Sequence, residues 1–347
     1  MGEKMGFCAR PKLAGQACIP VGLAAIMGPI GSFMGSRSRV SFVSNGGEAV
    51  TPLLKRDDRG FSGCVPDAFP GASPERSPAR ISLFPLTLPR QHGAWASLLA
   101  AFVLGTAVGG VPGPETALLL VAVLAAFAGR QSAVLALKLP LRDPRRVGLG
   151  WWAAVYAALV LAAGLSLAIA GSPRALAALG IVAGAILALT MVLDHRRMAF
   201  SAVAEAAGFT GLSLVAPAAE CVAAGAFTGR SAAVGALLAA YLIGSMLHVR
   251  FLLRAPRAFD TLAGRLRAGG ASLAFLFCVV GLADWAAASG YVPLLAPLAF
   301  LPALTKALRV VLIGHGARPV VVRAVGWREA VHLLLFVALV VAAYRLS

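Results

Sequence analysis

The sequence predicts an all-α membrane protein, a bundle of about nine transmembrane helices. Composition is the first indication: 59% of the 347 residues are hydrophobic and only 13% are charged, whereas soluble proteins have about 25% charged residues. The second is a series of apolar runs after residue 93, each roughly 17–23 residues long, which suffices to cross about 30 Å of hydrocarbon as a helix. These runs do not alternate polar and apolar residues, and this excludes a β-barrel.

The chain divides into two regions of different composition. Residues 1–85 are rich in Gly, Pro, Ser and Arg, and such a segment cannot bury enough apolar surface to offset the entropy lost on ordering. We therefore expect a disordered tail there. One hypothesis is that the tail arises from a start codon placed too early, which N-terminal sequencing of the native protein would test. Residues 86–347 form the predicted transmembrane domain.

The transmembrane domain is expected to contain nine helical spans. Gly and Ala are abundant within them, which allows helix backbones in a membrane to approach closely. The spans are expected at about 93–110, 116–138, 150–170, 174–193, 202–224, 231–253, 271–288, 291–312 and 329–345.

Basic residues indicate the orientation. Sixteen Lys and Arg residues precede the first span or follow the even-numbered spans, whereas three lie on the other side. The positive-inside rule then places the N-terminus in the cytoplasm and the C-terminus outside a bacterial inner membrane. The net charge of +17 suits anionic membrane lipid as a partner. The basic residues do not alternate with aromatic residues as in nucleic-acid binders, so no nucleic-acid partner is expected.

The cysteines do not indicate a metal centre. Five are scattered along the chain, and no two are spaced as C-x-x-C. This pattern matches neither a disulfide framework nor a zinc site. We expect no metal and no cofactor.

Five ionisable residues are predicted to form one site. Arg130, Glu205, His248 and Arg250 fall in the cytoplasmic half of their spans, and His92 begins the first span. A charge at the centre of a membrane helix costs about 2.5–3.5 kcal/mol. We therefore expect these residues to face a cytoplasmic polar cavity that binds an anionic ligand. Arg130 and Arg250 would hold the anion, both histidines would donate to it, and Glu205 would pair with Arg130 when the site is empty.

Other ionisable residues near the span ends have simpler interpretations. Lys306 and Arg309 are expected to extend to the lipid headgroups. Asp194 is interpreted as a surface carboxylate that neutralises Arg197. Glu220 is interpreted as a boundary residue near a loop on the outer side.

The entry to the first span carries a family resemblance. The sequence Leu88-Pro89-Arg90-Gln91-His92-Gly93-Ala94-Trp95, followed by nine spans, resembles the YwiC-like family of bacterial integral membrane proteins. The resemblance covers residues 85–347 and attaches no substrate. The simplest alternative for His92 is that it only anchors the helix at the membrane surface together with Arg90 and Trp95.

A more distant likeness is to the UbiA prenyltransferase superfamily, whose members have nine helices and a cytoplasmic N-terminus. In those enzymes Asp-rich motifs near the ends of spans two and six bind Mg²⁺ and a prenyl diphosphate. The corresponding stretches here, 129–138 and 241–250, contain no carboxylate pair, so a Mg²⁺-dependent mechanism is not supported. The alternatives left open are a metal-independent relative that acts on a lipid diphosphate and a secondary transporter. We see neither an inverted repeat nor a matched pair of broken helices to favour the transporter.

Overall fold

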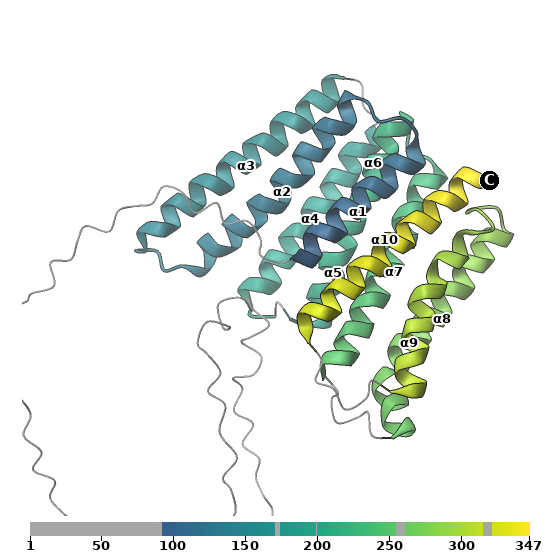
Figure 1. The fold of residues 1–347 in the computed structure, drawn as a ribbon. Coiled ribbons are helices and arrows are strands. Elements are labelled where there is room, and N and C mark those ends of the chain that lie inside the picture. The colour runs from purple at the N-terminus through teal and green to yellow at the C-terminus, as the bar shows by residue number, and fades with distance from the viewer. Residues whose placement is uncertain (1–91, 171–173, 199, 255–260, 315–320) are drawn as a thin grey trace, which may run out of the picture. The chain divides into compact units, whose positions relative to one another are not determined.

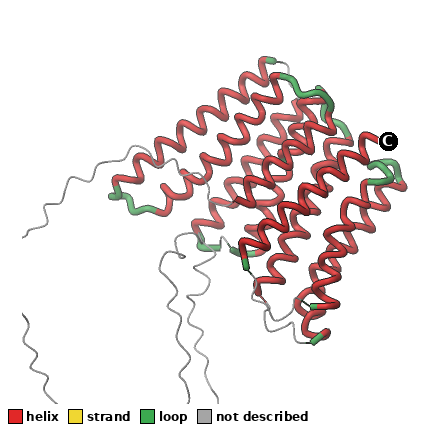
Figure 2. The backbone as a smooth tube through the Cα atoms, viewed as in Figure 1, coloured by secondary structure: helices red, strands yellow, loops and turns green. Residues whose placement is uncertain are grey.

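The computed structural model describes residues 92–170, 174–198, 200–254, 261–314 and 321–347, and the predicted tail lies outside these ranges. Every regular element of the described residues is helical (Figures 1 and 2). The elements are α1 (His92–Gly109), α2 (Pro114–Lys138), α3 (Pro144–Ile169), α4 (Arg174–His195), α5 (Ala202–Ser213), α6 (Val215–Ala224), α7 (Gly229–Arg254), α8 (Leu262–Ala288), η4 (Ala296–Phe300), α9 (Leu301–Ile313) and α10 (Val322–Leu346).

The described helices confirm the predicted fold class. Eight are long and apolar enough to cross a membrane, when α5 with α6 and η4 with α9 are each taken as one span, and α1 is a shorter apolar helix. The α5–α6 span is interrupted at Leu214, and Pro217 in the first turn of α6 has no N–H group to continue the hydrogen bonds of α5. The η4–α9 span begins as a 3₁₀ helix that contains Pro297, and Pro302 starts α9.

Successive spans run in opposite directions (Figure 1). The N-terminal ends of α3, α5, α8 and α10 therefore lie at the same end of the bundle as the C-terminal ends of α2, α4, α7 and α9. We call this the basic end. The helices extend further here than predicted, since α3 begins at Pro144, α8 at Leu262 and α10 at Val322. Basic residues that were assigned to loops therefore occupy first helical turns. Arg265 is an example: it donates from α8 to the carbonyls of Val311 and Leu312, at 2.8 and 3.1 Å, near the end of α9.

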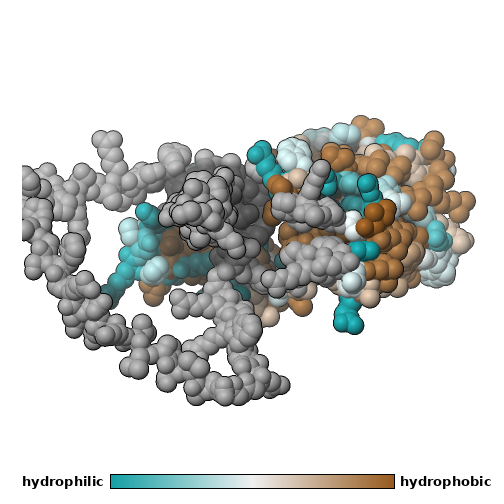
Figure 3. All heavy atoms as spheres, turned by 60° about the horizontal axis from the view of Figure 1, so that its bottom comes forward, coloured by the Kyte–Doolittle hydropathy of each residue, from teal (hydrophilic) through white to brown (hydrophobic). Residues whose placement is uncertain are grey.

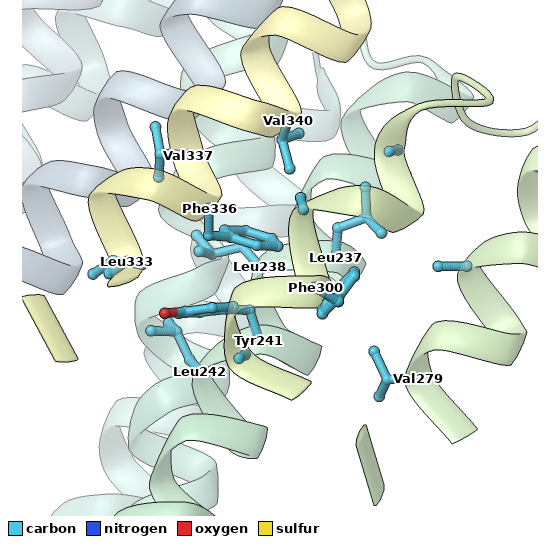
Figure 4. Close-up of a cluster of buried hydrophobic side chains, with 14 of the residues drawn as sticks. Leu237, Leu238, Tyr241, Leu242, Val279, Phe300, Leu333, Phe336, Val337 and Val340 are labelled. Carbon is cyan, nitrogen blue, oxygen red and sulfur yellow. The ribbon is translucent and has the colours of Figure 1, made fainter. Parts of the chain in front are cut away.

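The hydrophobic core is built mainly from α1, α6, α7, α8, α9 and α10. Its centre is aromatic: the Tyr241 ring of α7 stacks on Phe336 of α10 with centroids 4.3 Å apart, and Phe300 meets Phe336 edge-on at 5.2 Å (Figure 4). Such aromatic pairs stabilise the fold beyond the contribution of their buried apolar area. This core fixes the rotation of α7 and α10 about their axes, and thereby the direction of their polar residues.

Small residues bring α1 and α6 into close contact. Gly105 and Gly109 are one turn apart on α1, and a Cβ atom built on Gly105 would lie 2.1 Å from the Ala216 carbonyl oxygen. A Cβ on Gly109 would lie 2.7 Å from the Glu220 carbonyl oxygen. This is the small-xxx-small packing that membrane helices use when no hydrophobic driving force brings them together.

The outward faces of the helices are apolar. Leu161 on α3, Ile181 on α4 and Leu334 on α10 are each largely exposed. In Figure 3 hydrophobic residues cover much of the visible described surface. Exposed apolar area of this extent is expected of a surface that contacts lipid rather than water.

Candidate functional site

An ion-pair cluster joins α2 and α4 at the basic end. Arg130 donates to Asp194 at 3.1 Å, and the Lys138 ammonium lies 3.7 Å from the other oxygen of the same carboxylate. Arg130, Val134 and Lys138 are spaced four residues apart and so share one face of α2. Asp194 is in the last turn of α4, which brings its side chain to that face.

A shallow depression lies beside this cluster. Its polar lining is Lys138, Asp194 and His195, and the apolar side chains that complete it are Val134, Leu137 and Met191. It is a surface feature too small to enclose a water molecule, so a ligand would lie over it rather than inside it. Arg130 and Lys138 together carry one positive charge more than Asp194 neutralises, so the depression has a net positive charge even with a neutral His195.

The turn that follows α4 places further basic residues at the same end. Met198 N–H donates to the Leu193 carbonyl at 2.8 Å, and Arg197 N–H donates to the Asp194 carbonyl at 3.2 Å. Such bonds close helices whose next residue is left-handed. That residue is Arg197, with φ 59°, a conformation that favours glycine. The chain thus has an arginine at a position where glycine would be more stable.

A second ion pair supports the start of α5. Arg250 of α7 donates to Glu205 at 2.5 Å and to the Phe200 carbonyl at 3.3 and 3.4 Å. Ser201 caps α5 by accepting from the Ala204 N–H at 3.1 Å. The connection between α4 and α5 is therefore held at both ends, by Arg130 through Asp194 and by Arg250.

The structure brings together only some of the predicted site residues. Glu205 pairs with Arg250, so the predicted pairing of Glu205 with Arg130 is wrong. His248 is buried and precedes Arg250 by two residues, so it faces nearly the opposite side of α7. The side chain of His92 lies outside the described residues. The binding of an anion by these five residues stays a prediction.

Asp194 was also interpreted incorrectly, as a neutralising partner of Arg197. Its partners are instead Arg130 and Lys138 on another helix. The sequence does not show which helices are neighbours, and Arg197 was chosen because it follows Asp194 by only three residues. Proximity in sequence was therefore the weaker guide.

Free energies of unfolding can test the revised pairing. We expect Arg250→Ala and Glu205→Gln to be coupled by about 0.5–3 kcal/mol, because the two residues are direct partners. Arg130→Ala and Glu205→Gln should be additive within about 0.5 kcal/mol, since they share no partner. Denaturant unfolding of the purified chain in detergent micelles measures both cycles. Coupling in the second cycle with additivity in the first would restore the original pairing.

A buried cluster missed by sequence reasoning joins three helices. Lys306 of α9 donates to both carboxylate oxygens of Glu329 on α10, at 2.8 and 2.7 Å, and Ser245 of α7 also donates to Glu329. The Lys306 and Glu329 side chains are only 15% and 16% exposed. The prediction that Lys306 extends to the headgroups is therefore wrong. The sequence did contain a signal for this pair. Lys306 and Glu329 have opposite charges, and each lies about seven residues from the basic end of its helix.

Glu220 near the opposite end is buried as well. Its side chain accepts a hydrogen bond from Ser231 of α7, and the residue is 1% exposed. The interpretation of Glu220 as a boundary residue was therefore wrong. Arg230 is nearby, with its guanidinium 5.7 Å from the centre of the Tyr344 ring, a distance typical of cation–π contacts.

No group of three His, Cys, Asp or Glu side chains lies close enough to hold a metal ion among the residues that the structure describes.

One comparison with known proteins gave a match. The family model described as YwiC-like protein matches residues 88–220, from the entry to the first span through most of α6. This match confirms the resemblance predicted from the entry sequence. No curated protein matches the chain, and no solved structure matches it. The likeness to the UbiA superfamily stays a prediction.

Proposed function

We propose that this YwiC-like multi-pass membrane protein binds a phosphate-bearing anion at its basic end, in the depression between α2 and α4. The excess of positive charge around Asp194 supports the proposal, because the side chains of Lys138 and His195 are exposed there and can reach an anion that lies over the surface. Basic pockets between membrane helices on the cytoplasmic side suit lipid headgroups. A free phosphate or a diphosphate group would use the same donors.

Lys138 is the residue best placed to contact the anion. Its side chain is 48% exposed, and its 3.7 Å separation from Asp194 is longer than a hydrogen bond. Arg130 is closer to Asp194, at 3.1 Å. Lys138 can therefore turn to a ligand while Arg130 continues to neutralise the carboxylate. His195, in the same lining, would donate from its ring.

The left-handed backbone conformation of Arg197 also supports the proposal. The left-handed conformation costs a residue other than glycine roughly 1–2 kcal/mol. A basic side chain at this position adds positive charge beside the depression at the cost of stability. Arg196 precedes it and is also exposed.

We further propose that the basic end faces the cytoplasm of a bacterial cell, with the C-terminus outside. In a background without native cysteines, Arg145→Cys and Arg267→Cys should react with an impermeant maleimide only after the cytoplasmic side is opened. Gly113→Cys should react in intact cells. The two arginines are exposed near the starts of α3 and α8, so their replacement should not disturb packing. Labelling of Arg145→Cys in intact cells would reverse the orientation.

Anion binding can be tested with the purified full chain. Inorganic phosphate and pyrophosphate should raise the unfolding temperature in detergent relative to chloride at equal ionic strength, since a ligand that binds only the folded state stabilises it. Phosphatidylglycerol in nanodiscs should do the same relative to phosphatidylcholine. An effect of the lipid alone identifies a headgroup site, and an effect of the soluble anions identifies a free-anion site.

Matched variants locate the effect. Lys138→Gln should remove most of the stabilisation by the anion, whereas Arg174→Gln makes the same charge change at the opposite end and should leave it intact. Arg197→Gly should raise the unfolding temperature without anion and lower the response to anion. Equal losses in Lys138→Gln and Arg174→Gln would show a general charge effect and refute the site.

Secondary transport is a second candidate function, and the two interrupted spans favour it. The break at Leu214 and the 3₁₀ start of η4 resemble the discontinuous helices at transporter substrate sites. Phosphate uptake into proteoliposomes by wild type, with none by Lys138→Gln, would favour transport over binding alone. A metal-independent prenyltransferase relative would instead transfer the prenyl group of a prenyl diphosphate to an acceptor nucleophile and release free diphosphate.

A further inference from the structure

A polar cluster inside the bundle is separate from the proposed anion site. Glu329 lies about two turns into α10, and its carboxylate is held by Lys306 from α9 and Ser245 from α7. Carboxylates at this depth are costly and mark ligand or proton pathways in many membrane proteins. The cluster uses neither α2 nor α4, which form the depression.

Tyr241 has a hydrogen-bond donor that Glu329 does not use. It lies one turn before Ser245, which donates to Glu329, on the same face of α7. Figure 4 shows the hydroxyl pointing away from Phe300 and toward the side of Leu333, which follows Glu329 by one turn. Tyr241 is 2% exposed, and its hydroxyl makes no hydrogen bond to any residue that the structure describes. A buried hydroxyl without an acceptor is unfavourable, unless a ligand supplies the acceptor.

We propose that Lys306, Ser245 and Tyr241 form a binding site for a small monocarboxylic acid, and that Glu329 occupies this site as an internal substitute when no ligand is bound. The present occupant is itself a carboxylate, so the donors already have carboxylate geometry. The incoming carboxylate takes the Lys306 ammonium and the Ser245 hydroxyl from Glu329, and it also accepts from Tyr241.

The acid's proton has a defined destination. The ligand enters as a neutral acid, its proton passes to the carboxylate of Glu329, and its anion pairs with the Lys306 ammonium. The charge of the cluster is zero before and after this exchange, so no unpaired charge is buried. Neutral Glu329 can then leave the ammonium without the penalty of an isolated buried carboxylate.

Few other titratable groups face Glu329. Lys306 contributes from α9, while Arg309 on the same helix is exposed. On α10, His332 is half-buried and its ring contacts the Arg328 carbonyl. The described residues of α1 after His92 and those of η4 contain no titratable side chain, and α7 adds Tyr241 and the buried His248.

Radiolabelled acetate tests the proposal on the full chain in phosphatidylcholine nanodiscs. Wild type should bind acetate saturably, and its affinity for the anion should rise as the pH falls, because Glu329 must take up a proton. Glu329→Gln should bind more tightly at neutral pH and lose this dependence. Lys306→Met should abolish binding.

Tyr241→Phe separates binding from folding. Because its hydroxyl has no acceptor in the described structure, removing it should leave the unfolding temperature unchanged or higher. Its affinity for acetate should fall about tenfold or more, as expected for a lost hydrogen bond to a charged group. Unchanged affinity in Tyr241→Phe, or no saturable binding by wild type, would overturn the proposal. Lys138→Gln should bind acetate like wild type, so failure of the phosphate site and failure of this site are distinguishable.

Discussion

Lys306→Met is expected to lower the free energy of unfolding by about 3–5 kcal/mol, because it leaves the Glu329 carboxylate buried without its cation. Ser245 remains as a donor, but one hydroxyl cannot replace an ammonium that contacts both carboxylate oxygens. Denaturant unfolding of the purified chain in micelles gives the value. The exposed Arg309→Met, one turn further along α9, is the matched control and should cost less than about 0.5 kcal/mol.

The double variant separates a lost ion pair from lost packing. Lys306→Met/Glu329→Leu removes both charges and keeps apolar volume, so it should recover most of the stability of wild type. A double variant no more stable than Lys306→Met would show that the loss comes from packing around α9. In that case the ion pair would not be the interaction that holds α9 to α10.

Gly105→Ala is expected to cost about 3 kcal/mol or more, although it adds a single methyl group. The new Cβ would lie 2.1 Å from the Ala216 carbonyl oxygen and 2.9 Å from the Ala219 Cβ. Backbone atoms cannot rotate away as a flexible side chain can, so α1 and α6 would have to separate. Loss of this contact would also loosen the core that α1 shares with α10.

Gly164→Ala is the matched control, since a Cβ built on this glycine of α3 meets no atom within 4 Å. Alanine has a higher helix propensity, so this variant should be as stable as wild type or up to about 1 kcal/mol more stable. Thermal unfolding of both variants in the same detergent measures the difference. Similar unfolding temperatures for the two variants would show that α1 and α6 are not as close as described.

The sequence predicted the helical fold well because length and hydropathy act locally. The fifth span was predicted at about 202–224, and α5 with α6 runs over Ala202–Ala224. The predicted starts of α3, α8 and α10 are too late, because each span was predicted to begin only after the arginines that precede its apolar run. Basic residues are unfavourable in hydrocarbon but are good helix formers, so these helices continue past the apolar region.

The contacts among polar residues were harder to predict, since they depend on helix rotation and on which helices are neighbours. His248 and Arg250 were grouped by their depth in the membrane. Residues that are two positions apart on a helix, however, point in directions that differ by about 200°. The partner of Arg130 came from α4 rather than α5. Depth was sufficient to indicate that charges would pair, but not to choose the pairs.

The reactivity of Lys138 is the most direct test of whether an anion binds beside it. Lys138 and Lys306 are the only lysines between residues 86 and 347, and Lys306 is largely buried in its ion pair with Glu329. We would measure by mass spectrometry the rate at which an amine-reactive reagent modifies Lys138, in phosphate against chloride at equal ionic strength, and in phosphatidylglycerol against phosphatidylcholine nanodiscs. Anion binding at this position predicts saturable protection of Lys138 by phosphate or by phosphatidylglycerol. Equal rates in both comparisons would contradict it.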